Sequence, residues 1–303
     1  MKKILFLFLF SVGSTFGFAQ GFYIRMGLGY AFPQAAQTLD GTATPYNGTL
    51  NNTTQAYDMK GASFSAGLQG AVAAGYMFSG NVGIQLDANI GIAPKKYTFT
   101  ADNVDFGGGV SGSVSQVQQA STPFMLIPAL VVQSGGDKIN FYSRLGLALP
   151  LNTKITEDQV QTYGGGSAGA LTVDDYNLTI KNSFSLGFAG AAGIQYNLSD
   201  RVSLWGEVTI LSMSAYIKQV QLTAVSENGQ SVPLSAVSGA QTVNYSKHVT
   251  VDSSGANQAT YSQPFSNVGI NVGIRFNLSK NGGRHSGKRN DDDIDGAKPY
   301  RRR

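Results

Sequence analysis

The feature that most constrains this chain is a two-residue hydrophobic period that continues for ten or more residues at a time. In residues 22–32 the even positions are aliphatic or aromatic, and the odd positions hold Tyr23, Arg25, glycine or alanine. The same alternation returns in residues 64–78, 82–92, 139–151, 184–198, 202–210 and 268–278. An eighth segment, residues 124–132, is apolar at every position, so its facing cannot be read. A period of two over this length is the pattern of long β-strands.

Two kinds of connection alternate strictly between these segments. Short ones carry turn residues at 79–81, 134–138 and 197–201. Long ones, rich in Gly, Thr, Asn and Ser, cover roughly residues 34–60, 100–120, 152–180 and 219–260. This asymmetry is typical of outer-membrane barrels. The sequence therefore predicts an all-β fold, an eight-stranded antiparallel up-and-down transmembrane β-barrel with short periplasmic turns and long extracellular loops, located in the cell outer membrane.

The two faces of the alternating segments indicate which one meets lipid. One face carries small and amide side chains such as Gln69, Ala71 and Ala73, which suit a narrow lumen. The opposite face is aliphatic and uncharged, as at Leu86 and Leu145, and would cause precipitation in water. A soluble lipocalin-type barrel, the alternative, would instead cover its outer face with Lys and Glu. We therefore expect the apolar face to point outward into lipid.

Aromatic side chains near the strand ends predict two girdles at the level of the lipid headgroups. The residues expected at the short-turn end are Phe22, Phe78, Phe141, Tyr196 and Phe276, and those expected toward the long loops are Tyr30, Phe32, Tyr97, Phe99, Tyr216 and Tyr261.

Residues 202–217 break the regular parity. Their apolar side chains are even-numbered through Ile210 and odd-numbered at Leu211, Met213 and Ile217. One extra residue would turn the second set outward again, so the sequence predicts a β-bulge near Ile210 and Leu211.

The two ends differ from the body in composition. Lys2 and Lys3 precede an apolar run and the small-residue stretch 17–19, so residues 1–19 are expected to be a signal peptide. Residues 20–279 are then the barrel, and residues 280–303 a disordered mixed-charge periplasmic tail. Residues 291–296 match the start of a calcium loop, but Arg302 stands where a bidentate Glu is needed, so no metal site is expected.

The net charge of +4 belongs to these ends, because residues 20–278 hold 12 basic and 14 acidic side chains. Nucleic acid is therefore not an expected partner.

Five charged side chains lie on the predicted lumen face: Arg25, Asp87, Arg144, Glu207 and Arg275. Asp87, Arg144 and Glu207 each stand five residues above a short turn, so they share one level. Arg25 and Arg275 lie on the first and last strands, which become neighbours when the barrel closes. Because a lumen this narrow is filled by side chains, mixed charges are expected to pair across it and close it to ions. Two readings stay open: simple packing of a closed lumen, and a gate or polar plug.

Catalytic chemistry has little support in the sequence. The chain has no Cys and two His residues. His248 lies near Ser246, Asp252 and Ser253, but proximity on a loop does not set catalytic geometry. The glycine-rich stretch 187–193 lies inside a strand pattern with no helix after it, so it fails as a nucleotide loop. We expect no enzyme activity, no cofactor and no metal.

With its signal segment, strand count, loop asymmetry and a last strand, 269–276, that carries a late aromatic, the chain resembles the small outer-membrane β-barrel family of the OmpA transmembrane domain and OmpX. The resemblance covers about residues 21–278 and departs from many relatives because some 25 residues follow the last strand.

Three functions stay open. The first is a structural or interaction role, in which surface loops or the barrel wall bind outer-membrane or periplasmic protein partners, with membrane lipid and lipopolysaccharide around the wall. The loop tyrosines expected as contact anchors are Tyr46, Tyr57, Tyr163, Tyr176 and Tyr245. The alternatives are a small pore or carrier for apolar solutes or lipid, and a lipid-modifying barrel enzyme.

Overall fold

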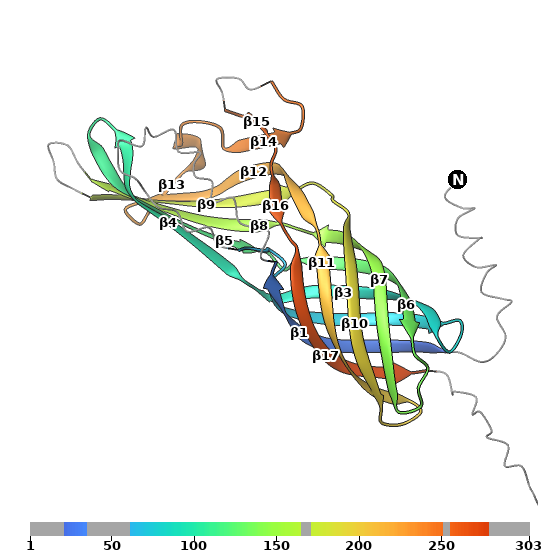
Figure 1. The fold of residues 1–303 in the computed structure, drawn as a ribbon. Coiled ribbons are helices and arrows are strands. Elements are labelled where there is room, and N and C mark those ends of the chain that lie inside the picture. The colour runs from blue at the N-terminus through green and yellow to red at the C-terminus, as the bar shows by residue number, and fades with distance from the viewer. Residues whose placement is uncertain (1–20, 35–60, 165–170, 251–254, 279–303) are drawn as a thin grey trace, which may run out of the picture.

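Eight strands of the chain close into an antiparallel barrel (Figure 1). In the computed structural model, which describes residues 21–34, 61–164, 171–250 and 255–278, the strand order around the barrel is β1-β17-β11-β10-β7-β6-β3-β2. Their bounds are β1 Phe22–Pro33, β2 Gly67–Met77, β3 Val82–Pro94, β6 Phe124–Gln133, β7 Ile139–Asn152, β10 Gly187–Asn197, β11 Val202–Ser212 and β17 Asn267–Asn277. Each segment with a two-residue period forms one of these strands, so the predicted eight-stranded barrel is confirmed.

Several sequence predictions concern residues outside this description. The signal peptide over 1–19, the tail over 280–303 with its calcium-loop match, and nearly all of the first long connection, including Tyr46 and Tyr57, lie outside the described residues.

The outer wall of the barrel is an apolar band. Leu86 and Leu145 are 48% and 68% exposed, whereas Gln85 and Asp87 on the same strand as Leu86 are buried in the lumen. The predicted facing is therefore confirmed. In β6, whose facing the sequence left open, the buried lumen side chains are Met125, Ile127, Ala129 and Val131. Among the described residues, no helix is long and apolar enough to cross a membrane.

The aromatic girdles agree with expectation at most positions. The exposed members are Phe22, Phe78, Phe141, Tyr196 and Phe276 at one end and Tyr30, Phe32, Tyr216 and Tyr261 at the other. Tyr97 and Phe99 are exceptions, because both belong to β4 above the barrel: Tyr97 is buried in an apolar cluster and Phe99 is half-buried.

The bulge predicted near Ile210 and Leu211 is absent. The pairing of β11 with both neighbours is in continuous register, and burial alternates without a break from residue 202 to residue 217. Leu211, Met213 and Ile217 instead point inward, where they are buried in an apolar cluster. The change of parity therefore marks the point where the interior turns from polar to apolar.

The long connections form a second sheet, which corrects the expectation of loops at 100–120, 152–180 and 219–260. Its order is β15-β14-β12-β9-β8-β5-β4, and two further strands, β13 and β16, pair with β12. The bounds are β4 Lys96–Gly107, β5 Val110–Ala120, β8 Ile155–Gly164, β9 Leu171–Asn182, β12 Ser214–Glu227, β13 Gln230–Val232, β14 Thr242–Ser246, β15 Asn257–Ala259 and β16 Ser262–Pro264, with a short 3₁₀ turn at Leu234–Ala236.

This extended sheet continues the barrel strands rather than standing apart from them. β12 follows β11 after Met213 alone, and β4 follows β3 after Lys95 alone. β8 continues β7, and β5 and β9 lead into β6 and β10. The sheet therefore rises from one side of the barrel, well beyond its rim (Figure 1).

A charge placed on the outer wall tests the facing. Leu86→Arg, near the middle of β3, should lower the free energy of unfolding from bilayers by about 2–4 kcal/mol. Ile92→Arg, equally outward but near the upper end of β3, is the matched control and should cost about 0–1 kcal/mol. Urea titration of the refolded variants measures both values, and equal costs at the two positions would contradict a membrane-spanning wall.

Candidate functional site

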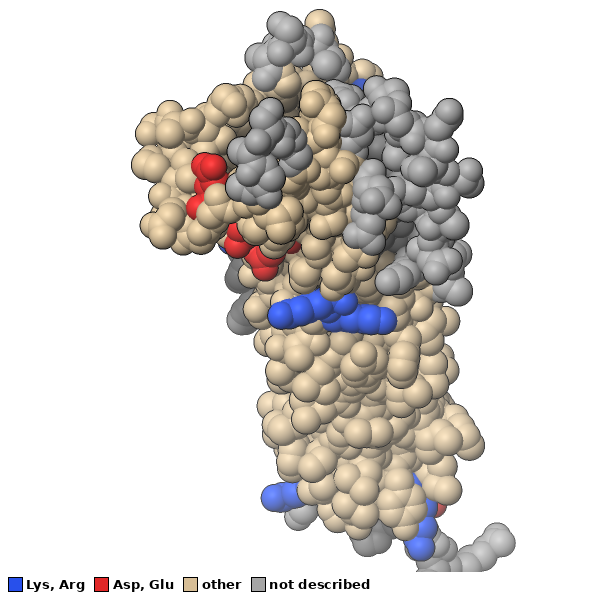
Figure 2. Space-filling view, turned by 90° about the vertical axis from the view of Figure 1, so that its left-hand side faces the viewer, with Lys and Arg blue, Asp and Glu red and all other residues tan. Residues whose placement is uncertain are grey.

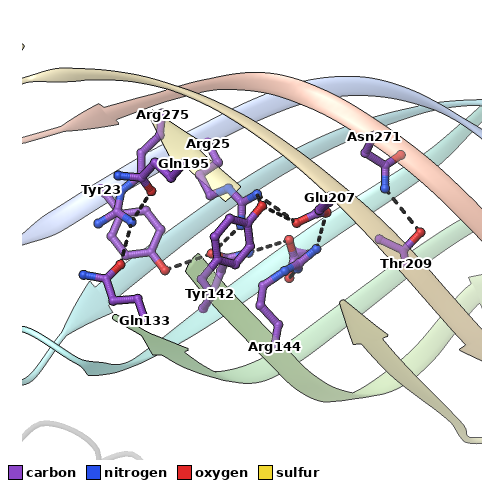
Figure 3. Close-up of polar contacts among 12 residues, drawn as sticks. Tyr23, Arg25, Gln133, Tyr142, Arg144, Gln195, Glu207, Thr209, Asn271 and Arg275 are labelled. Carbon is purple, nitrogen blue, oxygen red and sulfur yellow. Dashed lines mark hydrogen bonds and ion pairs between the residues drawn. The ribbon is translucent and has the colours of Figure 1, made fainter. Parts of the chain in front are cut away.

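Four charged side chains meet across the lumen through a central carboxylate (Figure 3). Arg25 Nη2 lies 2.9 Å from Glu207 Oε2, while Arg144 forms ion pairs with both Glu207 and Asp87. Arg25, Asp87 and Glu207 are buried, and the side chain of Arg144 is 10% exposed. These residues come from β1, β3, β7 and β11, and one other strand lies between each of these strands and the next around the barrel. The three ion pairs therefore join strands that are not hydrogen-bonded to each other.

Neutral side chains complete this ion-pair network. Tyr142 Oη donates to Glu207 Oε2 at 2.8 Å and accepts from Arg25 Nη2 at 2.7 Å. Gln85 Nε2 donates to Asp87 Oδ1 at 2.7 Å, and Gln85 Oε1 accepts from Tyr23 Oη at 2.8 Å. Because each carboxylate oxygen has at least one donor, the charges are well compensated despite their burial.

Two glycines make room for the largest side chain at this level. Gly27 and Gly273 are register partners on β1 and β17, and Trp205 pairs with Gly273 from β11. A Cβ atom at either glycine would lie within 2.5 Å of the Trp205 ring. The guanidinium carbon of Arg25 lies 4.1 Å from the centroid of the Trp205 ring. This cation–π contact helps to hold Arg25 in place for its ion pair with Glu207.

Arg275 does not join the ion pairs. It donates from Nη1 to Gln195 Oε1 and from Nε to Asn277 Oδ1, both at 2.9 Å, and its guanidinium carbon lies 3.7 Å from the Tyr23 ring centroid. The predicted set of five thus divides into four residues of one network, Arg25, Asp87, Arg144 and Glu207, and Arg275 in an amide-lined layer toward the short turns.

A second closure, which the sequence reasoning missed, lies at the sheet end of the lumen. Residues 62–66 are buried there, and the centroid of the Phe64 ring lies 5.8 Å from that of Phe265 and 5.9 Å from that of Tyr97. We call this cluster the apolar cap; its other members are Ala62, Ala120, Met125, Ile127, Ala148, Ile155, Ile180, Leu211, Met213, Ala215 and Ile217. The inward parity of Leu211 and Met213 was the sequence signal that pointed to it.

Backbone groups of the cap are held by hydrogen bonds. The Ser63 amide donates to Tyr97 Oη, which donates in turn to the Ser63 carbonyl, both at 2.9 Å. Phe64 N donates to the Pro264 carbonyl at 2.9 Å, and Asn267 Nδ2 donates to Ser65 Oγ at 2.6 Å. The segment is therefore fixed to β4 and to the residues that enter β17.

A small cavity separates the two closures. Its volume is about 50 Å³, and its lining includes Arg144 from the network, Leu211 from the cap and Thr209 between them. Pockets for small molecules usually measure about 300–1,000 Å³. The cavity is therefore large enough for a few water molecules and too small for an organic solute.

Of the residues considered for catalysis, the structure describes His248 and Ser246. His248 is exposed, and Ser246 Oγ bonds to the backbone of His248, accepting from its N at 3.1 Å and donating to its O at 2.7 Å. Asp252 and Ser253 lie outside the described residues. No group of three or more potential metal ligands occurs in the part of the chain that the structure describes.

The wall, the filled lumen and the strand count together define an outer-membrane-type β-barrel. No protein-family model matches the chain, and no curated protein matches it. Among solved structures it is similar to the outer membrane protein OprG from Pseudomonas aeruginosa, with 15% identity, a TM-score of 0.39 and coverage of 86% of this chain and 96% of that one. It is also similar to Ail, the attachment invasion locus protein of Yersinia pestis, with 9% identity, a TM-score of 0.28 and coverage of 85% and 97%. The barrel assignment itself rests on the strand pairing of this chain.

Removing the central carboxylate should destabilise the barrel. Glu207→Gln leaves Arg25 without an ion-pair partner and Arg144 with Asp87 alone, so the free energy of unfolding should fall by about 3 kcal/mol. Glu227→Gln, an exposed carboxylate at the end of β12, should change it by less than about 0.5 kcal/mol. Denaturant unfolding of both variants in the same vesicles makes the comparison, and equal losses would show that the network does not stabilise the fold.

Proposed function

We propose that the chain is an outer-membrane anchor that presents the extended sheet to a partner outside the cell and conducts no solute. One observation carries the proposal: ion pairs cross the lumen at one level and the apolar cap fills it at another, while the connections are built into a sheet that continues five of the barrel strands. A pore needs a free lumen, which the ion pairs and the apolar cap oppose. We also propose, as a finer point, kinship with the OmpA transmembrane domain and OmpX.

The extended sheet has the chemistry of a contact surface. Tyr163 and Tyr176 both donate to Asp174 Oδ2, at 2.9 and 3.2 Å. The hydrogen bond to Asp174 raises the pKa of Tyr163 to about 12, so this phenol keeps its proton at pH values where an ordinary tyrosine would lose it. Phe106 lies 5.2 Å from the Tyr163 ring. Tyrosines held in place on a strand bury contact area at little entropic cost, which suits protein recognition.

The pore alternative is tested by conductance in planar bilayers. We expect no steady conductance from the wild-type chain and none from Arg144→Ala, because the apolar cap still closes the sheet end after the network is broken. Stable single-channel steps from the wild type would overturn the proposal in favour of a pore. Steps from Arg144→Ala alone would show that the cap does not seal the lumen.

The interaction role is tested by site-specific crosslinking in native membranes. The chain has no Cys, so a single introduced thiol gives a photocrosslinker one defined attachment point on this chain. Ala224→Cys, exposed on β12, should give a discrete protein adduct, and Asp200→Cys, exposed in a short turn, should not give that adduct. Identical adducts from both sites, or no adduct from any position on the sheet, would contradict a sheet-specific partner.

A further inference from the structure

A row of lysines crosses the outer face of the molecule where the barrel meets the extended sheet (Figure 2). We define the lysine row as Lys96, Lys154, Lys181 and Lys218, all of them exposed. Lys96 lies on β4, Lys154 just before β8, Lys181 on β9 and Lys218 on β12. These strands and β5 are consecutive in the sheet, so at about 4.8 Å per strand the row spans about 19 Å.

The register places members of the row side by side. Ile155 pairs with Ile180, and the same register continued by one residue toward the barrel places Lys154 opposite Lys181. Lys181 pairs in turn with Gln219, at a bulge where Lys218 is the extra residue. Like charges on neighbouring strands destabilise a sheet unless an anion lies between them.

The structure supplies no such anion from the described residues. Their ion pairs all lie in the lumen, between Arg25, Asp87, Arg144 and Glu207. Lys181 Nζ donates to the neutral amide oxygens of Gln219 and Gln221, at 3.2 and 3.4 Å. The row is therefore a strip of positive charge without a carboxylate partner in the described part of the chain.

The lysine row also lies at a defined height above the apolar wall. On the barrel side of the row, the nearest exposed apolar side chains are Ile92, Leu151, Phe184 and Tyr216. Each is two to four residues along the chain from a lysine of the row. Lys247 Nζ, in addition, lies 4.3 Å from the Tyr216 ring centroid. Positive groups directly above a lipid-facing wall stand at the level of lipid phosphates.

The row is confined to one side of the rim. It follows the strands that continue β3, β7, β10 and β11, and at the described upper ends of β1, β2 and β17 no Lys or Arg is present. A general headgroup belt would surround the barrel. A one-sided row beside the extended sheet is instead the geometry of a docking site.

We propose that the lysine row binds the phosphate groups of anionic lipid headgroups in the leaflet around the sheet end of the barrel. The proposal rests on the outer-membrane anchor proposed above. It adds that this side of the barrel rim prefers lipids with anionic, phosphate-bearing headgroups. Bound phosphates would neutralise the row and hold the base of the sheet at the membrane surface.

The test measures lipid selectivity in phosphatidylcholine vesicles. Spin-labelled phosphatidic acid and spin-labelled phosphatidylcholine are compared by the fraction of each lipid immobilised at the protein surface. The wild-type chain should prefer phosphatidic acid by at least about fivefold. K154Q/K181Q should lose most of that preference, and K96Q/K218Q provides a second, independent pair.

The matched control is K138Q/R201Q, which removes two positive charges from exposed positions at the short-turn end. It should keep the wild-type preference. Equal immobilisation of both lipids by an inserted wild-type chain, or equal losses in the row and control variants, would overturn the proposal.

Two further arms keep the outcomes distinct. Alkaline extraction of the vesicles reports insertion, and a wild-type chain that washes off contradicts the membrane location rather than the row. Inorganic phosphate, compared with chloride at equal ionic strength, separates lipid from soluble anion. Selective loss of the lipid preference in phosphate would reassign the row to a soluble phosphate ligand and overturn the lipid proposal.

Discussion

The structure depends on one steric constraint: the interior of an eight-stranded barrel has room for side chains and little else. Most inward polar groups therefore need a partner among the other side chains of the lumen. Glu207 meets this demand by accepting from Arg25 of β1 and from Tyr142 and Arg144 of β7. The glycines beside Trp205 follow from the same constraint, because a large ring on one strand requires the absence of side chains on its neighbours.

The barrel was predictable because its wall and lumen have opposite chemistry, so alternation reveals both strand and facing. The network was partly predictable, because Asp87, Arg144 and Glu207 lie at the same height above the short turns and carry opposite charges that can pair. The pairing of Arg275 with Gln195 was not, because a long side chain chooses between two directions along the lumen and sequence position does not say which.

The extended sheet was not predicted because its strands are largely polar and lack the clear alternation of apolar and polar residues that marks the barrel strands. Gln116 and Gln118 of β5 lie beside Gln159 and Glu157 of β8, so hydrogen bonds between side chains replace apolar contacts. One local signal was available. Asn228 and Gly229 both have positive φ, 49° and 78°, and form the two-residue turn of the β12–β13 hairpin, for which Asn-Gly is the preferred sequence.

The direct passage of β11 into β12 through Met213, and of β3 into β4 through Lys95, has a mechanical consequence. A pull on the far end of the sheet acts along the strand axes, so neighbouring strands would have to slide past one another and break many backbone hydrogen bonds together. The ion pairs across the lumen share that tension among strands that are not adjacent. A partner that bound the sheet, as proposed above, would be tethered to the whole barrel rather than to one loop.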